Sequence, residues 1–233
     1  MRFMSFNIQH CLNYLEQKID FEIMAETIKA CCADVVGLNE VRGAGTDPEY
    51  EAQTEILAGL CGMGYYYFAK TINFDGGPYG NAILSRIPIL KAETISIPDP
   101  DPRGYDGYYE SRCILKAELE GGITVLITHL GLNPDEKESA VTTIIEQISK
   151  EKCVVMGDFN MTADDEIIRP IYSFMNDASV GFCDEKLSFP SVAPHCKIDY
   201  IFTSRDVTVA FSDIPDIVAS DHRPHFADLN FKM

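Results

Sequence analysis

The sequence lacks any long apolar run and any leader-like segment at its start. No hydrophobic stretch in the 233 residues approaches the roughly 20 residues that span a bilayer. The opening segment, MRFMSFNIQH, has neither the apolar core nor the small-residue cleavage site of a secretion signal. We therefore expect a cytoplasmic protein that does not act at a membrane.

Positive charge is also scarce, because 19 Lys and Arg residues stand against 36 Asp and Glu residues, which gives a net charge of −17 at pH 7. Such a field repels a phosphate backbone, and non-specific nucleic-acid binding draws on an excess of lysine and arginine. The charge weakens the case for a general nuclease without excluding one.

The eight cysteines lack the spacing of a disulfide framework or of paired CxxC motifs. Most stand singly in strand-like segments, as expected of buried reduced thiols in a cytosolic protein. A zinc site from Cys183, His195 and Cys196 lacks that paired spacing, so we do not expect one. Of the other histidines, His10 follows a strand end and is a weak site candidate, whereas His225 is expected to be structural.

No repeat, low-complexity tract or linker divides the chain, so we expect a single domain over residues 1–233. Apolar residues at helical spacing predict helices over residues 14–32, 47–62 and 133–150. Strands are predicted over residues 1–8, 33–41, 65–70, 80–86, 89–97, 111–120, 123–130, 152–160, 197–204, 207–211 and 225–231. Several strands are joined without a helix, which favours two packed, mostly antiparallel sheets over a doubly wound parallel sheet.

Polar residues stand where the apolar strands stop. The set consists of Asn7, Glu40, His129, Asp158 and Asn160 at strand ends, Asp199 within KIDYIF, and Asp221 and His222 before the last strand. A strand rim with carboxylates, amides and histidines is where such scaffolds build sites, and Mg²⁺ prefers hard oxygen ligands. Each piece alone has a plain alternative, such as an Asx turn for GDFN or a solvated loop acid for Glu40. Their joint occurrence in one order favours a site.

The ordered motifs FNI, LNEV, PYGNAILSR, ITHL, MGDFN, KIDYIF and SDHRP resemble those of the endonuclease/exonuclease/phosphatase superfamily, across nearly the whole chain. The resemblance implies an α/β fold of the DNase I-like type: a four-layer α/β sandwich, with two mixed β-sheets packed face to face and flanked by helices. It also implies hydrolysis of phosphate esters with Mg²⁺ or Mn²⁺, by in-line attack of water without a covalent intermediate.

The resemblance also implies roles for the rim residues. Glu40 would be the principal metal ligand, with Asn7 and Asp221 close to the ion. The catalytic set would be His129, Asp158, Asn160, Asp199 and His222, with Asp199 orienting His222. Asn81, Arg112 and Tyr79 would lie on the substrate side, where Asn81 supports His129 and Arg112 contacts phosphate. Which histidine is acid and which is base stays open.

Two positions depart from the family pattern. Asn39 stands before Glu40, where the family usually has the longer glutamine. Asn81 stands where some nucleases of the group have a glutamate that supports the second histidine. Since an amide does not stabilise imidazolium as a carboxylate does, we expect His129 to be a weaker proton donor or to act mainly through hydrogen bonding.

The acidic composition and the compact size favour a small phosphorylated metabolite or a short single-stranded substrate over duplex DNA, and we expect no obligate protein partner. The loop at residues 98–110 carries Tyr105, Tyr108 and Tyr109, which either stack on a base or sugar or pack the loop down.

Two other classes of function remain open. A DNA-directed endonuclease or exonuclease would need a basic groove, built from Arg2, Lys70, Arg86, Arg103 and Arg112. A catalytically silent binding protein on the same fold would normally have lost site residues, and this chain retains the set.

Overall fold

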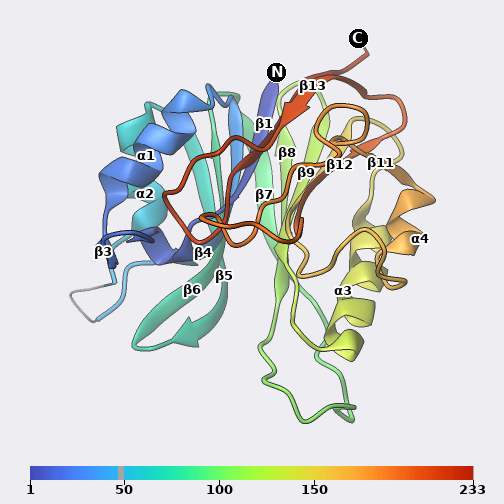
Figure 1. Cartoon of the computed structure of the whole chain (residues 1–233), viewed down its shortest axis with the longest axis horizontal. Helices are drawn as coiled ribbons and strands as arrows, with labels where there is room; N and C mark the ends of the chain where they lie inside the picture. The colour runs from blue at the N-terminus through green and yellow to red at the C-terminus, as the bar shows by residue number, and fades with distance from the viewer. Residues whose placement is uncertain (47–49, 233) are drawn as a thin grey trace.

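The computed structural model describes residues 1–46 and 50–232, and over these residues the strands form two six-stranded sheets that pack face to face (Figure 1). The first sheet has the order β13 (Thr208–Asp213), β14 (His225–Asn230), β1 (Arg2–Asn7), β4 (Val35–Arg42), β6 (Gly77–Ser85) and β5 (Tyr65–Phe74). The second has the order β11 (Met175–Asp177), β12 (Asp199–Ser204), β10 (Cys153–Asp158), β9 (Ile123–His129), β8 (Cys113–Leu119) and β7 (Ile89–Ser96).

Both sheets are mixed, since each has a parallel pair at its centre and antiparallel strands outside it. β1 runs parallel to β4, and β9 runs parallel to β10. The carboxyl ends of parallel neighbours meet at one edge of a sheet. This topology therefore brings Asn7 beside Asn39 in the first sheet and His129 beside Asp158 in the second.

Helices cover the outer face of each sheet and complete the four layers. α1 (Phe21–Ala30) and α2 (Gln53–Cys61) lie on the first sheet, and α3 (Pro134–Gln147) and the short α4 (Arg169–Tyr172) lie on the second (Figure 1). A short 3₁₀ turn, η1 (Gln9–Cys11), and the small pair β2 (Leu12–Asn13) and β3 (Lys18–Ile19) follow β1. The expected fold class, a four-layer α/β sandwich, is confirmed.

The two sheets touch through apolar side chains of both inner faces, among them Phe3, Ile83, Ile127 and Met156, all fully buried. Gly37 of β4 lies at a close contact between the sheets, because a Cβ there would lie 2.9 Å from Met156 Cε. This contact fixes the spacing between the two sheets just below the polar rim.

The predicted helix boundaries need correction. The helix predicted over residues 14–32 begins only at Phe21, because the Asn13 side chain accepts hydrogen bonds from the Leu15 and Glu16 amides and holds a turn there. The helix predicted over 47–62 spans Gln53–Cys61, and its residues 47–49 lie outside the described residues. The third predicted helix is observed as α3, whose first turn carries a capping box between Asn133 and Glu136.

Two expected absences can be compared with the structure. All eight cysteines lie in the described residues and are free thiols. Within the described part of the chain, no helix is both long enough and apolar enough to cross a bilayer.

Candidate active site

The predicted site residues come from both sheets and meet at one rim of the sandwich. Glu40 reaches this rim through an irregularity in β4, where the register with β6 shifts between Leu38 and Val41. Glu40 itself has a φ of +59°, a backbone conformation that residues other than glycine rarely adopt outside functional or strained positions. Such a bulge re-aims a side chain at the end of a strand.

Asn7 joins the carboxylates of the two sheets. Its Nδ2 donates to Glu40 Oε1 at 3.0 Å and to Asp158 Oδ2 at 3.1 Å. The second oxygen of Glu40 accepts a hydrogen bond from the Tyr79 hydroxyl at 2.8 Å. Asn7, Glu40, Asp158 and Tyr79 therefore form one hydrogen-bonded group, although they lie far apart in the sequence.

His222 is oriented by Asp199, as the sequence predicted. Its Nδ1 lies 2.8 Å from Asp199 Oδ2, and its Nε2 lies 3.5 Å from Asp158 Oδ2. Burial alone would lower the pKa of His222, but the carboxylates of Asp199 and Asp158 raise that pKa to about 10. The Phe189 ring packs at 4.7 Å from the imidazole and covers it. The geometry therefore favours a protonated His222 held between two carboxylates.

His129 faces Asp158 from the other side, with its Nε2 3.5 Å from Asp158 Oδ2. The same nitrogen lies 3.2 Å from Nδ2 of Asn160, which also donates to the Leu130 carbonyl at 3.0 Å. Burial, with the positive charge of Arg112 and then of His222, holds the pKa of His129 well below its usual value. His129 is therefore neutral, in contrast to His222.

Asp158 lies at the centre of the site and is almost completely buried. Burial raises the pKa of its carboxyl to about 7, against the opposing effect of His222. Its Oδ1 accepts the backbone N–H of Asn160 at 2.9 Å, which leaves Oδ2 facing both histidines. A carboxyl group with a pKa near neutrality can exchange a proton at physiological pH.

Arg112 is paired through Nη1 with Glu110 Oε1 at 2.9 Å. Its buried Nε has no hydrogen-bond partner. A cavity of about 10 Å³, room for about one water, is lined by Thr71, Tyr79, Gly80, Asn81, Glu110, Arg112 and His129. The structure therefore brings together the three residues predicted for substrate binding, Asn81, Arg112 and Tyr79, beside His129.

Asn81 has different hydrogen-bond partners from the one predicted. Its Oδ1 accepts from Asn39 Nδ2 at 2.8 Å, and its Nδ2 donates to the Cys113 carbonyl at 3.3 Å. The amide is thus engaged with β4 and β8, although Asn81 lies beside His129 in the cavity. The expected support of His129 by this amide needs correction, because both ends of the amide bond elsewhere.

Sequence reasoning missed a second group of positioning residues, the buried serines Ser188 and Ser191. Ser188 Oγ accepts the backbone N–H of Asp199 at 3.3 Å, and the Ser188 carbonyl accepts that of Arg223 at 2.8 Å. Ser191 N donates to the Asp221 carbonyl at 2.7 Å. These bonds hold the loop of Asp221 and His222 against Asp199. They link segments distant in sequence, so no local motif signals them.

The donor set fits a divalent cation. Burial raises the pKa of Asp221, His222 lowers that pKa, and Glu40 raises it further, so the carboxyl groups of Asp221 and Glu40 lie near enough to repel each other when both are charged. Among the described residues, the one compact group of three acidic, histidine or cysteine ligands is Asp158, Asp199 and His222. A His222 that is already bonded to Asp199 and positively charged is a poor ligand. Glu40, with Asn7 and Asp221, remains the better candidate on charge and oxygen chemistry.

Of the remaining histidines, His225 is buried in the core and His10 lies near the site. His225 is fully buried, and its Nε2 lies 2.9 Å from Ser212 Oγ, consistent with the expected structural role. Burial and Arg42 lower the pKa of His10, whereas Glu40 raises it, which places His10 near the acidic rim. The described residues contain no compact ligand group that includes Cys183, His195 and Cys196.

The cationic residues that a nuclease groove would need are dispersed. The backbone amides of Arg2 and Arg86 both bond to Asp34, which precedes β4, whereas Glu40 lies near the other end of that strand. The Arg2 guanidinium is paired with Asp228 at 2.7 Å. Arg103 stacks over the Tyr109 ring at 4.7 Å. At least two of the five predicted groove residues therefore lie away from the site.

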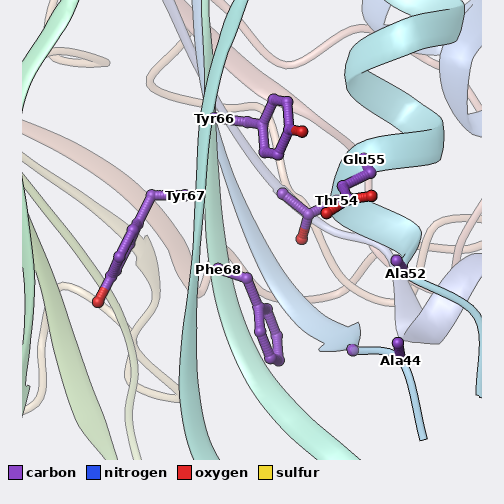
Figure 2. Close-up of a pocket in the computed structure, with 8 residues that line it drawn as sticks. Ala44, Ala52, Thr54, Glu55, Tyr66, Tyr67 and Phe68 are labelled. Atoms are coloured by element: carbon purple, nitrogen blue, oxygen red, sulfur yellow. The ribbon is translucent and has the colours of Figure 1, made fainter.

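A separate pocket of about 280 Å³ opens between β5 and the start of α2. Figure 2 shows Tyr66 and Phe68 on the side of β5 toward α2, while Tyr67 points the opposite way. None of the described residues that line it belongs to the predicted site. The predicted site residues lie instead at the rim between the two sheets.

Known proteins resemble this chain in sequence and in fold. The uncharacterized protein YbhP of Escherichia coli K12 is 25% identical over 171 residues, which are 67% of this chain and 65% of that protein, so the match spans less than two thirds of the relative. An endonuclease/exonuclease/phosphatase from Beutenbergia cavernae has a TM-score of 0.81 at 20% identity, covering 99% of this chain and 71% of the other. A mannosyl-6-phosphatase from Bacteroides thetaiotaomicron has a TM-score of 0.77 at 16% identity, covering 99% and 100%.

The family model described as the endonuclease/exonuclease/phosphatase family matches residues 4–222, a range that includes every residue of the hydrogen-bonded site described above. The chain belongs to the endonuclease/exonuclease/phosphatase family.

Proposed function

We propose that this protein is a divalent-metal-dependent hydrolase of phosphate esters, acting on a small phosphorylated metabolite or a short nucleotide. The main support for this proposal is the position of Asp158, whose Oδ2 lies 3.5 Å from Nε2 of both His129 and His222. A buried carboxylate between a neutral and a charged imidazole is a suitable arrangement for moving a proton during hydrolysis.

Asp158 takes the proton of the attacking water, which Asn160 helps to hold. The raised pKa of Asp158, about 7, suits a general base at neutral pH. His222, kept protonated by Asp199, stabilises the negative charge that develops on the phosphate. His129 is neutral and contributes hydrogen bonding, and Arg112 neutralises charge on the non-bridging oxygens.

Glu40, Asn7 and Asp221 would hold a divalent cation, Mg²⁺ or Mn²⁺. When bound, the cation supplies Lewis-acid stabilisation of a phosphate oxygen and of the leaving oxygen. Tyr79 and Asn7 fix the two oxygens of Glu40 in advance through their hydrogen bonds of 2.8 and 3.0 Å, so the carboxylate is already oriented.

The loop at residues 98–110 adjoins the site at Glu110, which lines the same cavity as Tyr79, Arg112 and His129. Its Tyr109 hydroxyl donates to Asp135 at 2.7 Å, and Asn133 donates to the Tyr108 carbonyl at 2.8 Å, so the loop is tied to the start of α3. Tyr109 therefore packs the loop, whereas Tyr105 and Tyr108 are exposed and available to a ring of the substrate. This arrangement supports a substrate of limited size.

The net charge of −17 and the dispersal of Arg2 and Arg86 support a small ester over duplex DNA. The mannosyl-6-phosphatase of similar fold makes a sugar phosphate a reasonable member of the test panel. A DNA-directed nuclease remains the second candidate, since Arg112 lies at the site. Cytoplasmic location stays a prediction from the sequence.

The test is hydrolysis of a panel by the purified protein with Mg²⁺, Mn²⁺ or a chelator: a phosphomonoester, a phosphodiester, a hexose 6-phosphate, supercoiled plasmid and an abasic oligonucleotide. We expect metal-dependent turnover of small esters with the plasmid intact. Nicking of the plasmid without turnover of any small ester would overturn the substrate assignment in favour of a nuclease.

A further inference from the structure

Asn39 is completely buried at the junction of the two sheets, one residue before Glu40. Its Nδ2 donates to the Thr128 carbonyl at 2.9 Å and to Asn81 Oδ1 at 2.8 Å. Its Oδ1 accepts the backbone N–H of Asp158 at 3.0 Å. One amide therefore uses both of its ends to join β4 and β6 of the first sheet to β9 and β10 of the second.

Each partner of this amide lies next to a group of the proposed chemistry. Thr128 directly precedes His129, and the Asp158 amide belongs to the central carboxylate itself. Glu40 follows Asn39 and has its unusual backbone conformation, with a φ of +59°. A displacement of the Asn39 side chain would thus move Glu40, His129 and Asp158 relative to one another.

The packing on both sides of the Asn39 amide is close. Gly37, two residues earlier on β4, brings the sheets so close that an added Cβ would lie 2.9 Å from Met156 Cε. Gly157, just before Asp158, approaches β9 so closely that a Cβ would meet the Thr128 carbonyl oxygen at 1.8 Å. The short side chain of Asn39 therefore matches a close approach of the two sheets, which it spans with hydrogen bonds of 2.9 and 3.0 Å.

We propose that Asn39 is a positioning residue: its side-chain amide sets the distance between the Glu40 half of the site and the Asp158–His129 half, without touching the substrate. The inference rests on the proposed function, because it concerns the geometry of the same site. A misplacement of about 1 Å between catalytic groups can lower a rate about 100-fold, so the loss should appear in kcat.

The test compares three variants of the full chain. Asn39→Leu removes all three hydrogen bonds at similar side-chain size, and Asn39→Asp keeps only the acceptor for the Asp158 amide. Ser204→Ala is the control, since Ser204 is also buried and its Oγ also accepts a backbone N–H of β10, that of Cys153, but at the end of the strand opposite Asp158. The readouts are kcat and KM on the best small ester, thermal melting, and exchange of the Asp158 amide proton by NMR.

We expect Asn39→Leu to lower kcat about 100-fold with a smaller change in KM, and to speed exchange of the Asp158 amide proton. Asn39→Asp should lower kcat but keep the Asp158 amide proton protected from exchange. This variant tests the proposal if Asn39→Leu does not fold. Ser204→Ala should leave kcat unchanged even if it lowers the melting temperature. A folded Asn39 variant with unchanged kcat would overturn the proposal.

The two proposals can fail separately. If the wild-type protein hydrolyses no ester in the panel, the proposed function fails, and the exchange rates still test whether Asn39 holds Asp158. If the wild type is active and the exchange of the Asp158 amide is the same in Asn39→Leu as in the wild type, only the positioning role fails.

Discussion

His222 Nδ1 lies 2.8 Å from Asp199 Oδ2, and this contact leaves the other ring nitrogen, Nε2, directed at the rest of the site. The other nitrogen, Nε2, is left 3.5 Å from Asp158 Oδ2. His129 reaches the same oxygen at the same distance, but its low pKa keeps it neutral. Two histidines with opposite pKa shifts thus flank one carboxylate, which separates their roles.

Replacing Asp199 by Asn should lower kcat by about 100-fold or more, because the amide no longer fixes the charged form of His222. The pKa of His222, raised to about 10 mainly by Asp199 against the effect of burial, should fall. Asp206→Asn is a matched control, since Asp206 bonds to Ser204 and Lys152 away from the rim. Kinetics with NMR titration of the imidazole would test this, and an Asp199→Asn enzyme with wild-type kcat would rule out the pair.

Replacing Arg112 by Met should lower kcat/KM about 100-fold, because the charge proposed to neutralise the phosphate is lost and Glu110 is left without its partner. Arg86→Met serves as the control: Arg86 also donates to protein groups, the carbonyls of Cys61 and Gly62, but at the other end of the first sheet. Steady-state kinetics of both variants would measure the two changes in kcat/KM. Equal effects of the two substitutions would contradict the placement of Arg112 beside the phosphate.

Replacing Gly157 by Ala should lower the free energy of unfolding by about 3 kcal/mol or more, from backbone strain and overpacking together. Gly157 has a φ of +148°, and an added Cβ would lie 1.8 Å from the Thr128 carbonyl oxygen. Gly59→Ala in α2, where nothing lies within 4 Å of the added Cβ, should instead stabilise the protein by about 1 kcal/mol. Urea denaturation measures both, and a stable Gly157→Ala protein would contradict the close approach of β9 and β10.

The burial of His225 should make the protein lose stability as the pH falls into the mildly acidic range. Burial lowers the pKa of His225 to about 4, so the native state keeps it neutral while the unfolded chain takes up a proton below a pH of about 6.5. The stability it contributes is therefore complete above that pH and is lost as the pH falls toward 4. The difference in unfolding free energy between wild type and His225→Gln, measured from pH 7 to pH 4.5, should shrink as the pH falls. Parallel curves would contradict this assignment.

The strand-end residues were predictable because their signal is local. Asn7, His129 and Asp158 each end an apolar strand, and a strand rim collects its terminal side chains. Glu40 was predicted at a strand end but lies two residues before the end of β4, where the register shift turns its side chain to the same rim. The helix predicted from residue 14 was too long at its start, because the apolar period does not reveal that Asn13 holds a turn with the Leu15 and Glu16 amides. A single polar side chain overrode the pattern.

The contacts across the two sheets could not be predicted in this way. Asn39 bonds to Thr128 and to the Asp158 amide, 89 and 119 positions further along the chain. Asn81 bonds at 2.8 Å to Asn39, which lies on the neighbouring strand of the same sheet, rather than supporting His129. The bonds across the two sheets depend on the distance between packed layers, which no local spacing of residues encodes.

The most direct test of the account is the rate of hydrolysis of a small phosphate ester, measured with Mg²⁺ for the wild type and for Asp158→Asn at matched thermal stability. We predict turnover by the wild type, its loss with chelator, and a fall of about 100-fold or more in the variant, because an amide cannot take the proton of the attacking water. Equal turnover by the two proteins would contradict the central role of Asp158.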